Sequence, residues 1–418
     1  MTGSPSVGVM ALILACGVAG PAFAASDTPF AGVFSPDAFH GLAEVRAAAA
    51  GGEPSWLDGG FGKTSVSGGG DVKLTSAALE WRPSFSFAVS GVVSALYQPD
   101  PEHHLDLMEA YLKVKAPPLS GTRISGRMGV FYPPVSMEND GIAWSTPDML
   151  SASALNSWIG EEVKVGGLEV TVQRSVGGHE LEATAGVFGW NDTAGTLLTF
   201  RGWALGEERT GVRTAYELPQ LSRFAGQFQP DETYPFRELD HRPGFYGRLE
   251  WRPPAPLAVN VFFYDNAGDR TSVDSDHQWA WETRFFNAGV RWQPTQDIRV
   301  LAQAMNGETI EGFSPPGGHW FDVGFQSAYV LAQRRFGPDT VSGRIDAFRT
   351  RDRTFRAIDD NQENGWAATA SWRHRLAPHA DLILEAQHVD SKRNARRLVG
   401  EDPKQAQSLV QSALRLSF

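Results

Sequence analysis

Apolar side chains recur at every second position along most of the chain. In residues 245–252 one face carries Phe245, Leu249 and Trp251, whereas Arg248 and Glu250 lie on the other face. Residues 366–372 and 410–418 show the same alternation. A period of two is typical of β-strands that have one apolar and one polar face. The pattern therefore predicts an all-β fold.

The connections between these stretches alternate between short and long. The short ones are built on Gly or Pro, which favour tight turns, and fall at 82–84, 116–118, 176–178, 253–256, 293–295, 336–338 and 377–379. The long ones run roughly over 48–70, 97–104, 132–160, 190–241, 266–279, 307–319, 351–364 and 391–405.

The strands between these connections are expected near 38–47, 71–82, 85–96, 105–115, 121–131, 161–174, 179–190, 242–252, 257–265, 280–292, 297–306, 320–334, 339–350, 365–376, 380–390 and 406–418. That makes about 16 strands, an even number with both chain ends on the short-turn side. Residues 190–241 contain two further strand-like stretches, Leu197–Leu205 and Arg209–Leu218. A hairpin there would raise the number to about 18.

The segregation of short and long connections favours a membrane barrel over a soluble secreted β-protein, because a sandwich has no reason to sort loops by length. We expect a single transmembrane antiparallel β-barrel with short periplasmic turns and long extracellular loops. Its apolar face would meet lipid and its polar face would line a wet interior. The mean hydropathy of -0.26 excludes a polytopic helical membrane protein. The net charge of -11 speaks against nucleic acid as a partner.

The first 24 residues predict a cleaved signal peptide. An apolar run over 10–19 is followed by the small-x-small triplet Ala22-Phe23-Ala24, which is typical of a cleavage site. Cys16 offers a less favoured lipoprotein interpretation. After cleavage, residues 25–418 would form one cysteine-free barrel domain.

Two features resemble the bacterial outer-membrane porins, both general-diffusion and phosphate-selective ones. The last strand ends on the aromatic Phe418 after alternating apolar residues, which is similar to the insertion signal of outer-membrane barrels. The long segment near 132–160 sits where porins fold a loop into the barrel to narrow it. The resemblance implies a location in the cell outer membrane and a water-filled channel for passive diffusion of small hydrophilic solutes and ions.

The same resemblance implies several partners and no cofactor. We expect contact with outer-membrane lipid and lipopolysaccharide, and insertion by the barrel-assembly machinery. Homotrimers are typical of general porins, but the pattern does not separate a lipid-facing surface from a protomer contact. A substrate-specific channel for phosphate, carboxylates or sugars, with about 18 strands, is the alternative.

Strand parity places many arginines on the inward face. We expect the pore constriction to be built from Arg123, Arg127, Arg248, Arg291, Arg299 and Arg344 on the wall and from Glu138, Asp140 and Asp148 on the loop. The acidic loop would oppose Arg123 and Arg127 in particular. Arginine stays charged, so such a wall lowers the barrier for anions and predicts a mild anion preference. The plainer interpretation is that these are solvated side chains on a wide inner wall.

Tryptophans are expected in two roles. Trp144 and Trp158 would pin the loop against the wall rather than stack on a sugar. An interfacial girdle would be formed by Trp81, Trp251, Trp281, Trp292 and Trp372.

No catalytic motif stands out, and we expect neither an enzyme nor a metal site. His103-His104 and the acidic loop with Asp265, Asp269, Asp274 and Asp276 are weak candidates for binding a cation. A barrel enzyme is the less favoured alternative, and it would use His277 with Asp276 or His319 with Ser314.

Overall fold

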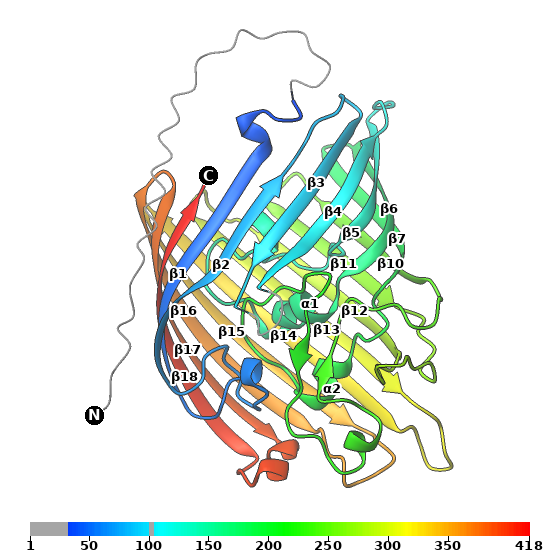
Figure 1. Cartoon of the computed structure of the whole chain (residues 1–418). Coiled ribbons are helices and arrows are strands. Elements are labelled where there is room, and N and C mark those ends of the chain that lie inside the picture. Colours follow the sequence, from blue (N-terminus) through cyan, green and yellow to red (C-terminus); the bar gives the residue numbers. More distant parts are fainter. Residues whose placement is uncertain (1–31, 100–103) are drawn as a thin grey trace, which may run out of the picture.

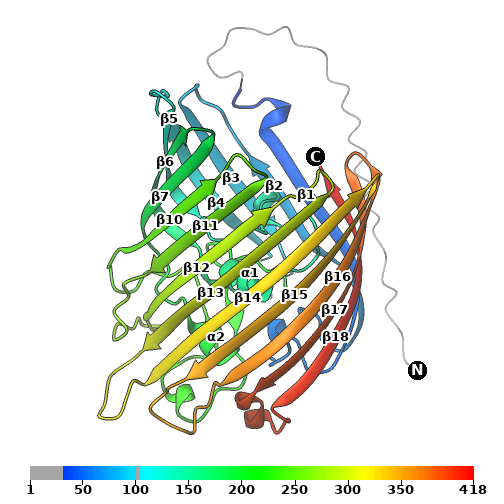
Figure 2. The ribbon, with the colours of Figure 1, turned by 180° about the vertical axis from the view of Figure 1, so that it is seen from behind.

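The computed structural model describes residues 32–99 and 104–418, apart from the side chain of Asp71. The expected signal peptide, Cys16 and His103 lie outside the described residues. Sixteen antiparallel strands close into one barrel (Figures 1 and 2). The chain is therefore an all-β barrel, as the alternating pattern and loop lengths predict.

The barrel strands are β1 (Phe39–Gly51), β2 (Gly69–Trp81), β3 (Val89–Tyr97), β4 (Leu105–Lys115), β5 (Thr122–Phe131), β6 (Val165–Val176), β7 (His179–Gly189), β10 (Gly244–Arg252), β11 (Leu257–Asp265), β12 (Trp281–Trp292), β13 (Ile298–Glu311), β14 (Phe321–Phe336), β15 (Asp339–Asp352), β16 (Glu363–Ala377), β17 (Ala380–Arg393) and β18 (Lys404–Ser417). Each pairs with its neighbour in sequence, β7 pairs with β10, and β1 pairs with β18. The backbones of Gly41 and Phe418 close the seam with hydrogen bonds of 3.0 and 3.1 Å.

The two ends of the barrel differ. The end that carries the tight turns and both termini of the barrel, upper in Figure 1, is called the short-turn end, and the opposite end is the long-loop end. The β6–β7 turn illustrates the tight connections: Gly177 and Gly178 both adopt positive φ, 57° and 83°. Such a two-residue turn matches the right-handed twist of the flanking strands, and glycine adopts the positive φ that it requires without steric cost.

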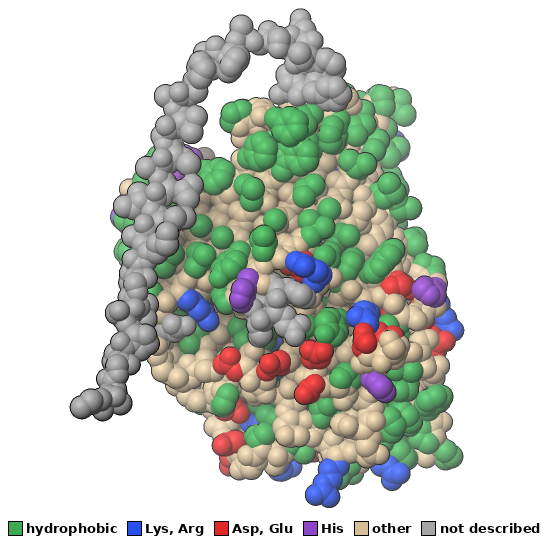
Figure 3. All heavy atoms as spheres, in the orientation of Figure 1, with side chains coloured by type: hydrophobic (Ala, Val, Ile, Leu, Met, Phe, Trp, Pro, Cys, Tyr) green, Lys and Arg blue, Asp and Glu red, His purple; other side chains and the backbone are tan. Residues whose placement is uncertain are grey.

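The outward face is apolar along the strands. Leu249, Phe286 and Val410 point outward and are 61%, 64% and 62% exposed. In Figure 3 apolar side chains spread over the upper half of the front face, with a band of charged residues below them. Exposed apolar surface of this extent indicates contact with an apolar phase rather than with water.

The segments between β7 and β10 do not add barrel strands. Helix α2 (Thr196–Phe200) occupies the first strand-like stretch, and Tyr216–Glu217 (β8) pairs with Glu232–Thr233 (β9) in a separate small sheet. The alternative of about 18 strands is therefore wrong. Helix α1 (Ala154–Glu162) also corrects the expected start of the next strand from 161 to Val165.

In the part of the chain that the structure describes, five short 3-10 helices lie outside the strands: η1 (Pro36–Ala38), η2 (Trp56–Asp58), η3 (Ile142–Trp144), η4 (Ala225–Gln227) and η5 (Asn394–Val399). Among the described residues, none of the helices is long and apolar enough to cross a membrane.

Candidate functional site: the barrel lumen

Two loops enter the barrel and fill one side of it. The first inward loop comprises residues 132–163 and the second comprises residues 190–243. Helix α1 of the first loop is completely buried, and it begins where the Ser153 side chain accepts a hydrogen bond from the backbone N–H of Asn156 (3.2 Å). Figure 1 shows α1 inside the barrel, and in Figure 2, the view from behind, strands β12–β14 lie in front of it.

Part of the inner wall behind α1 is aromatic. The Trp158 ring lies 5.0 Å from that of Phe325, 5.5 Å from that of Phe285 and 6.1 Å from that of Trp203. All four side chains are buried. The prediction that Trp158 holds the loop against the wall is supported by this packing. The expected wet interior is replaced here by a buried apolar cluster. Trp281 is likewise buried, 5.9 Å from Phe200, so it does not belong to an outer girdle.

Arg344 on β15 anchors the first inward loop. Its guanidinium contacts Glu138 and Asp346 at 2.8 Å each, and it donates to the carbonyl oxygens of Ser151 (2.6 Å) and Ala152 (2.8 Å). The Arg344 side chain is fully buried. A buried guanidinium needs this many acceptors, because an uncompensated charge there would be very costly.

The other loop acids also bind the wall beside them. Asp148 forms an ion pair with Arg299, and Asp140 lies 3.8 Å from Arg291. The loop acids therefore pair with Arg291, Arg299 and Arg344 beside them and not with Arg123 or Arg127. Strand parity places the arginines inward, but it carries no information on which part of the wall the loop contacts.

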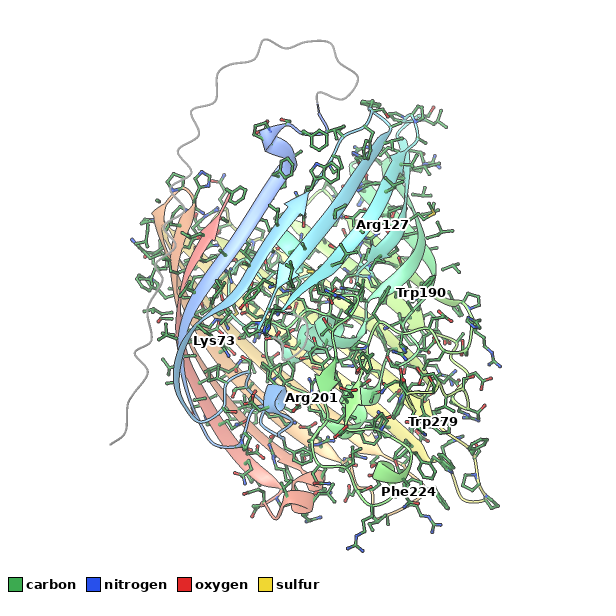
Figure 4. The ribbon with its side chains drawn as sticks, in the orientation of Figure 1. Lys73, Arg127, Trp190, Arg201, Phe224 and Trp279 are labelled. Atoms are coloured by element: carbon green, nitrogen blue, oxygen red, sulfur yellow. The ribbon has the colours of Figure 1, made fainter. Side chains whose placement is uncertain are left out.

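Arg123 and Arg127 lie on β5, on the opposite side of the lumen. Arg127 contacts Glu169 of β6 at 2.8 Å and donates to the backbone oxygen of Tyr132 at 3.0 Å. Arg248 of β10 contacts Glu182 of β7 at 2.7 Å. Figure 4 places Arg127 in the half of the barrel that carries the short turns. These pairs neutralise part of the wall charge.

A cavity of about 580 Å³ opens at this end and is called the short-turn cavity. Its charged lining residues are Lys113, Lys115, Arg123, Arg127, Glu169 and Glu182. Since the two glutamates pair with Arg127 and Arg248, the excess charge of the cavity is positive.

A second cavity, of about 540 Å³, opens at the other end and is called the long-loop cavity. Its charged lining comes from β2 and β4 and from loop residues, namely Asp58, Lys73, His104, Asp106, Glu208, Arg209 and Glu217. Acids outnumber bases in this set. Burial raises the pKa of Glu208 to about 7, which weakens its negative charge near neutral pH. The two cavities therefore differ in the sign of their charge.

A buried carboxylate joins the two inward loops, a feature that sequence reasoning missed. Glu162, the last residue of α1, accepts hydrogen bonds from Trp158 Nε1 (2.5 Å) and from the backbone N–H of Leu197 (2.9 Å) in α2. Burial raises the pKa of Glu162 to about 7. Neighbouring Glu161 contacts Arg201 at 2.5 Å. In the sequence, this contact between the two inward loops is signalled by the adjacent acids Glu161 and Glu162 at the end of a long connection.

The weaker candidates for catalysis and metal binding lie in exposed loops. Ser314 Oγ is 2.8 Å from His319 Nδ1, but Arg270 Nη1 approaches the same nitrogen at 3.2 Å. Two groups therefore share one ring nitrogen, and this exposed pair lacks the third group that would orient a catalytic base. In the acidic loop, Asp274 and Asp276 both pair with Arg237.

One acidic group could hold a metal. The carboxylates of Asp192, Glu238 and Asp240 lie within 4.8 Å of one another. The Asp192 carboxylate already accepts hydrogen bonds from the backbone N–H groups of Leu239 (2.5 Å) and Asp240 (3.2 Å). Burial raises the pKa of Asp192 to about 7. The group therefore has an evident role in holding loop backbone.

No family model matches the sequence, and a search of the curated proteins finds no match either. Solved structures do match over most of the chain. The outer-membrane channel DcaP of Acinetobacter baumannii is 10% identical at a TM-score of 0.57, and the match covers 91% of this chain and 96% of that one. The anion-selective porin from Comamonas acidovorans is 10% identical at a TM-score of 0.51, with coverage of 91% and 98%.

The trimer form of OmpT, an outer-membrane protein of Vibrio cholerae, is 9% identical at a TM-score of 0.50, with coverage of 91% and 98%. These matches extend over nearly the whole barrel of each protein. Together with the sixteen-stranded closure, the inward loops and the apolar outer face, they show that the chain has the fold of the bacterial outer-membrane porins.

Proposed function

We propose that the protein is an outer-membrane channel through which small hydrophilic solutes and ions diffuse passively. The observation that carries this proposal is the pair of polar cavities, about 580 and 540 Å³, that enter the barrel from opposite ends. Both lie on the side of the lumen that α1 leaves free. Charged and polar linings lower the barrier for hydrated solutes, whereas the apolar core behind α1 excludes them.

Liposome swelling tests the proposal. Vesicles that contain the folded protein should swell in small sugars and amino acids, at rates that fall with solute size. Vesicles with heat-denatured protein are the control. Swelling no faster than in the control would contradict a diffusion channel.

A substrate-specific channel is the second candidate, now with 16 strands. The specific observation in its favour is that the two inward loops occupy much of the lumen and leave narrow cavities. Channel current discriminates between the candidates: millimolar phosphate, carboxylate or sugar should block a specific channel and leave a general one unaffected.

A mild anion preference follows from the charges of the two cavities. Lys113, Lys115 and Arg123 give the short-turn cavity an excess of positive charge, and the acidic long-loop cavity offsets part of it. Within a narrow pore such fields act over a few ångström with little screening. Arg123 is expected to contribute because no carboxylate pairs with it among the described residues.

The reversal potential in a potassium chloride gradient checks this preference. The wild-type channel should favour chloride modestly, and Arg123→Gln should reduce the preference about twofold, since one charge in a wet pore is worth a fraction of a kcal/mol. Arg174→Gln is the matched control, because Arg174 is exposed on the neighbouring strand and alternates to the outer face. Cation selectivity of the wild type would contradict the assignment.

The outer membrane is the expected location, with lipid and lipopolysaccharide around the barrel. Phe418 would serve as the insertion signal for the barrel-assembly machinery; its ring is 65% exposed on the outside. A homotrimer is the proposed assembly, and the trimeric form of the structurally similar OmpT supports it.

Replacing outward Leu249 by arginine tests the contact with lipid. Arginine on the lipid face of a barrel costs about 2–4 kcal/mol near the bilayer centre. Urea unfolding in lipid vesicles should reveal a loss of up to that size for Leu249→Arg, depending on its depth in the bilayer. Val273→Arg is the control, since Val273 is an exposed apolar residue in a long loop. Equal stability of the two variants would place residue 249 outside the bilayer.

A further inference from the structure

The long-loop cavity has the size of a binding site for a small molecule. Its walls are the connection between β1 and β2, strands β2 to β4 and the second inward loop. The volume of about 540 Å³ falls in the range of pockets that enclose small organic ligands. Besides its charged residues, the lining includes the polar side chains of Ser65, Ser67, Gln98 and Thr214 and the apolar ones of Leu57, Val66 and Leu96. A ligand that fits this lining carries several polar groups and some apolar surface.

Two exposed carboxylates, those of Asp58 and Glu217, lie at the rim of the cavity and are called the rim pair. They are close to each other, because a methyl group added to Gly59 would lie 3.2 Å from Glu217 Oε2. Asp58 accepts a hydrogen bond from the Ser67 hydroxyl. Among the described residues, neither carboxylate of the rim pair forms an ion pair. The rim pair therefore attracts a cation that enters the cavity.

The other charges leave the cavity negative. The carboxylates of Asp58, Asp106, Glu208 and Glu217 line it, against the cationic side chains of Lys73 and Arg209. Arg209 is 3% exposed and donates to the carbonyl oxygen of Ala143 at 2.8 Å, so the first inward loop takes up part of its charge. Since the raised pKa of Glu208 weakens its charge near neutral pH, the rim pair supplies most of the attraction for a cation.

Trp56 adds a hydrogen-bond donor without a partner. Its side chain lines the cavity and is 1% exposed, and among the described residues no acceptor lies within hydrogen-bond reach of its Nε1. Buried indole N–H groups nearly always have a partner. This N–H group therefore needs an oxygen atom from outside the chain.

The unpartnered donor and the rim pair belong to the same small region. Trp56 and Asp58 are both part of η2, and Tyr216 precedes Glu217 in β8. The rings of Trp56 and Tyr216 lie 6.2 Å apart, which brings η2 and β8 together. One molecule of monosaccharide size can therefore reach the rim pair and the indole at the same time.

We infer that the long-loop cavity binds a cationic aminosugar of monosaccharide size. This inference rests on the proposed channel function and names a solute for it. The ammonium group would pair with Asp58 and Glu217, and a hydroxyl oxygen would accept from Trp56 Nε1. The C–H face of the sugar ring would pack against Tyr216. A neutral sugar lacks the charge, and a simple amine lacks the oxygen, so each satisfies only part of the site.

Isothermal titration calorimetry of the folded full-length protein in detergent tests the inference, with glucosamine and glucose as probes. Glucosamine should bind about tenfold more tightly than glucose, because its ammonium forms charge-assisted hydrogen bonds. Equal affinity for the two sugars would overturn the inference.

Variants separate the two parts of the site. The double variant D58N/E217Q should lower glucosamine affinity about tenfold and leave glucose affinity unchanged. Trp56→Phe keeps a ring but removes the donor, so it should weaken both sugars about threefold. Asp297→Asn is the matched control, because it removes an exposed carboxylate from a turn at the opposite end of the barrel. Heat-modifiable migration on a gel verifies that each variant is folded.

Calorimetry and channel current together separate the site from the channel function. If the protein conducts but D58N/E217Q binds glucosamine as tightly as the wild type, the inference is wrong and the channel function stands. If the folded protein prefers glucosamine and the double variant loses that preference, the binding site is supported. That result holds even for a protein that carries no current, in which case the channel function alone is contradicted.

Discussion

Replacing Arg344 by methionine is expected to lower the free energy of unfolding by about 3–5 kcal/mol, because it leaves buried charges without a partner. Glu138 and Asp346 would lose their shared cation, and the carbonyl oxygens of Ser151 and Ala152 would lose a donor. Urea unfolding in vesicles measures the loss. Release of the first inward loop should also raise the single-channel conductance.

Two controls sharpen this experiment. Arg349→Met removes an exposed arginine from the same strand and should change stability little. The triple variant R344M/E138Q/D346N should lose less than Arg344→Met alone, because no buried charge remains uncompensated. A loss below about 1 kcal/mol for Arg344→Met would mean that the ion cluster does not hold the loop.

Replacing Trp158 by alanine is the second substitution expected to lower the free energy of unfolding strongly. The ring is fully buried against Phe285, Phe325 and Trp203, and its Nε1 donates to Glu162 at 2.5 Å. Removal of a buried tryptophan typically costs about 3–5 kcal/mol. The same unfolding measurement should show that loss, and a wider channel should follow if α1 moves.

Trp366→Ala is the matched control, because Trp366 is 46% exposed on the outer face. Trp158→Phe should retain most of the ring packing and lie between wild type and alanine. Should Trp158→Ala unfold at the wild-type urea concentration, α1 would not be part of a packed core.

The barrel itself could be predicted from the sequence. A two-residue period such as that around Leu249, together with loops of alternating length, is dictated by one apolar face and by closure. These are local properties, and a single chain displays them directly. The inward positions of Arg127 and Arg344 follow from the same parity.

The contents of the barrel could not be predicted in the same way. Which wall the first inward loop contacts depends on non-local packing, so the ion pair of Asp148 with Arg299 has no signature in spacing. The apolar core did leave a signal: Phe262-Phe263 and Phe285-Phe286 place one ring on each face of a strand. Aromatic residues on both faces indicate packing on both sides, which a wet inner wall does not require.

The structure of the second inward loop could not be predicted either, because it also depends on non-local packing. Leu197–Leu205 alternates well enough to suggest a strand, but Glu162 and the buried surface around it stabilise helix α2 there instead. Tertiary contacts overrode a weak local preference, as they often do in short segments.

Single-channel recording tests most directly whether a water-filled route crosses this barrel. Folded protein added to a planar bilayer should produce discrete, ohmic current steps, with chloride carrying slightly more current than potassium. Protein whose folding is verified by heat-modifiable migration, yet which inserts without producing such steps, would contradict the account.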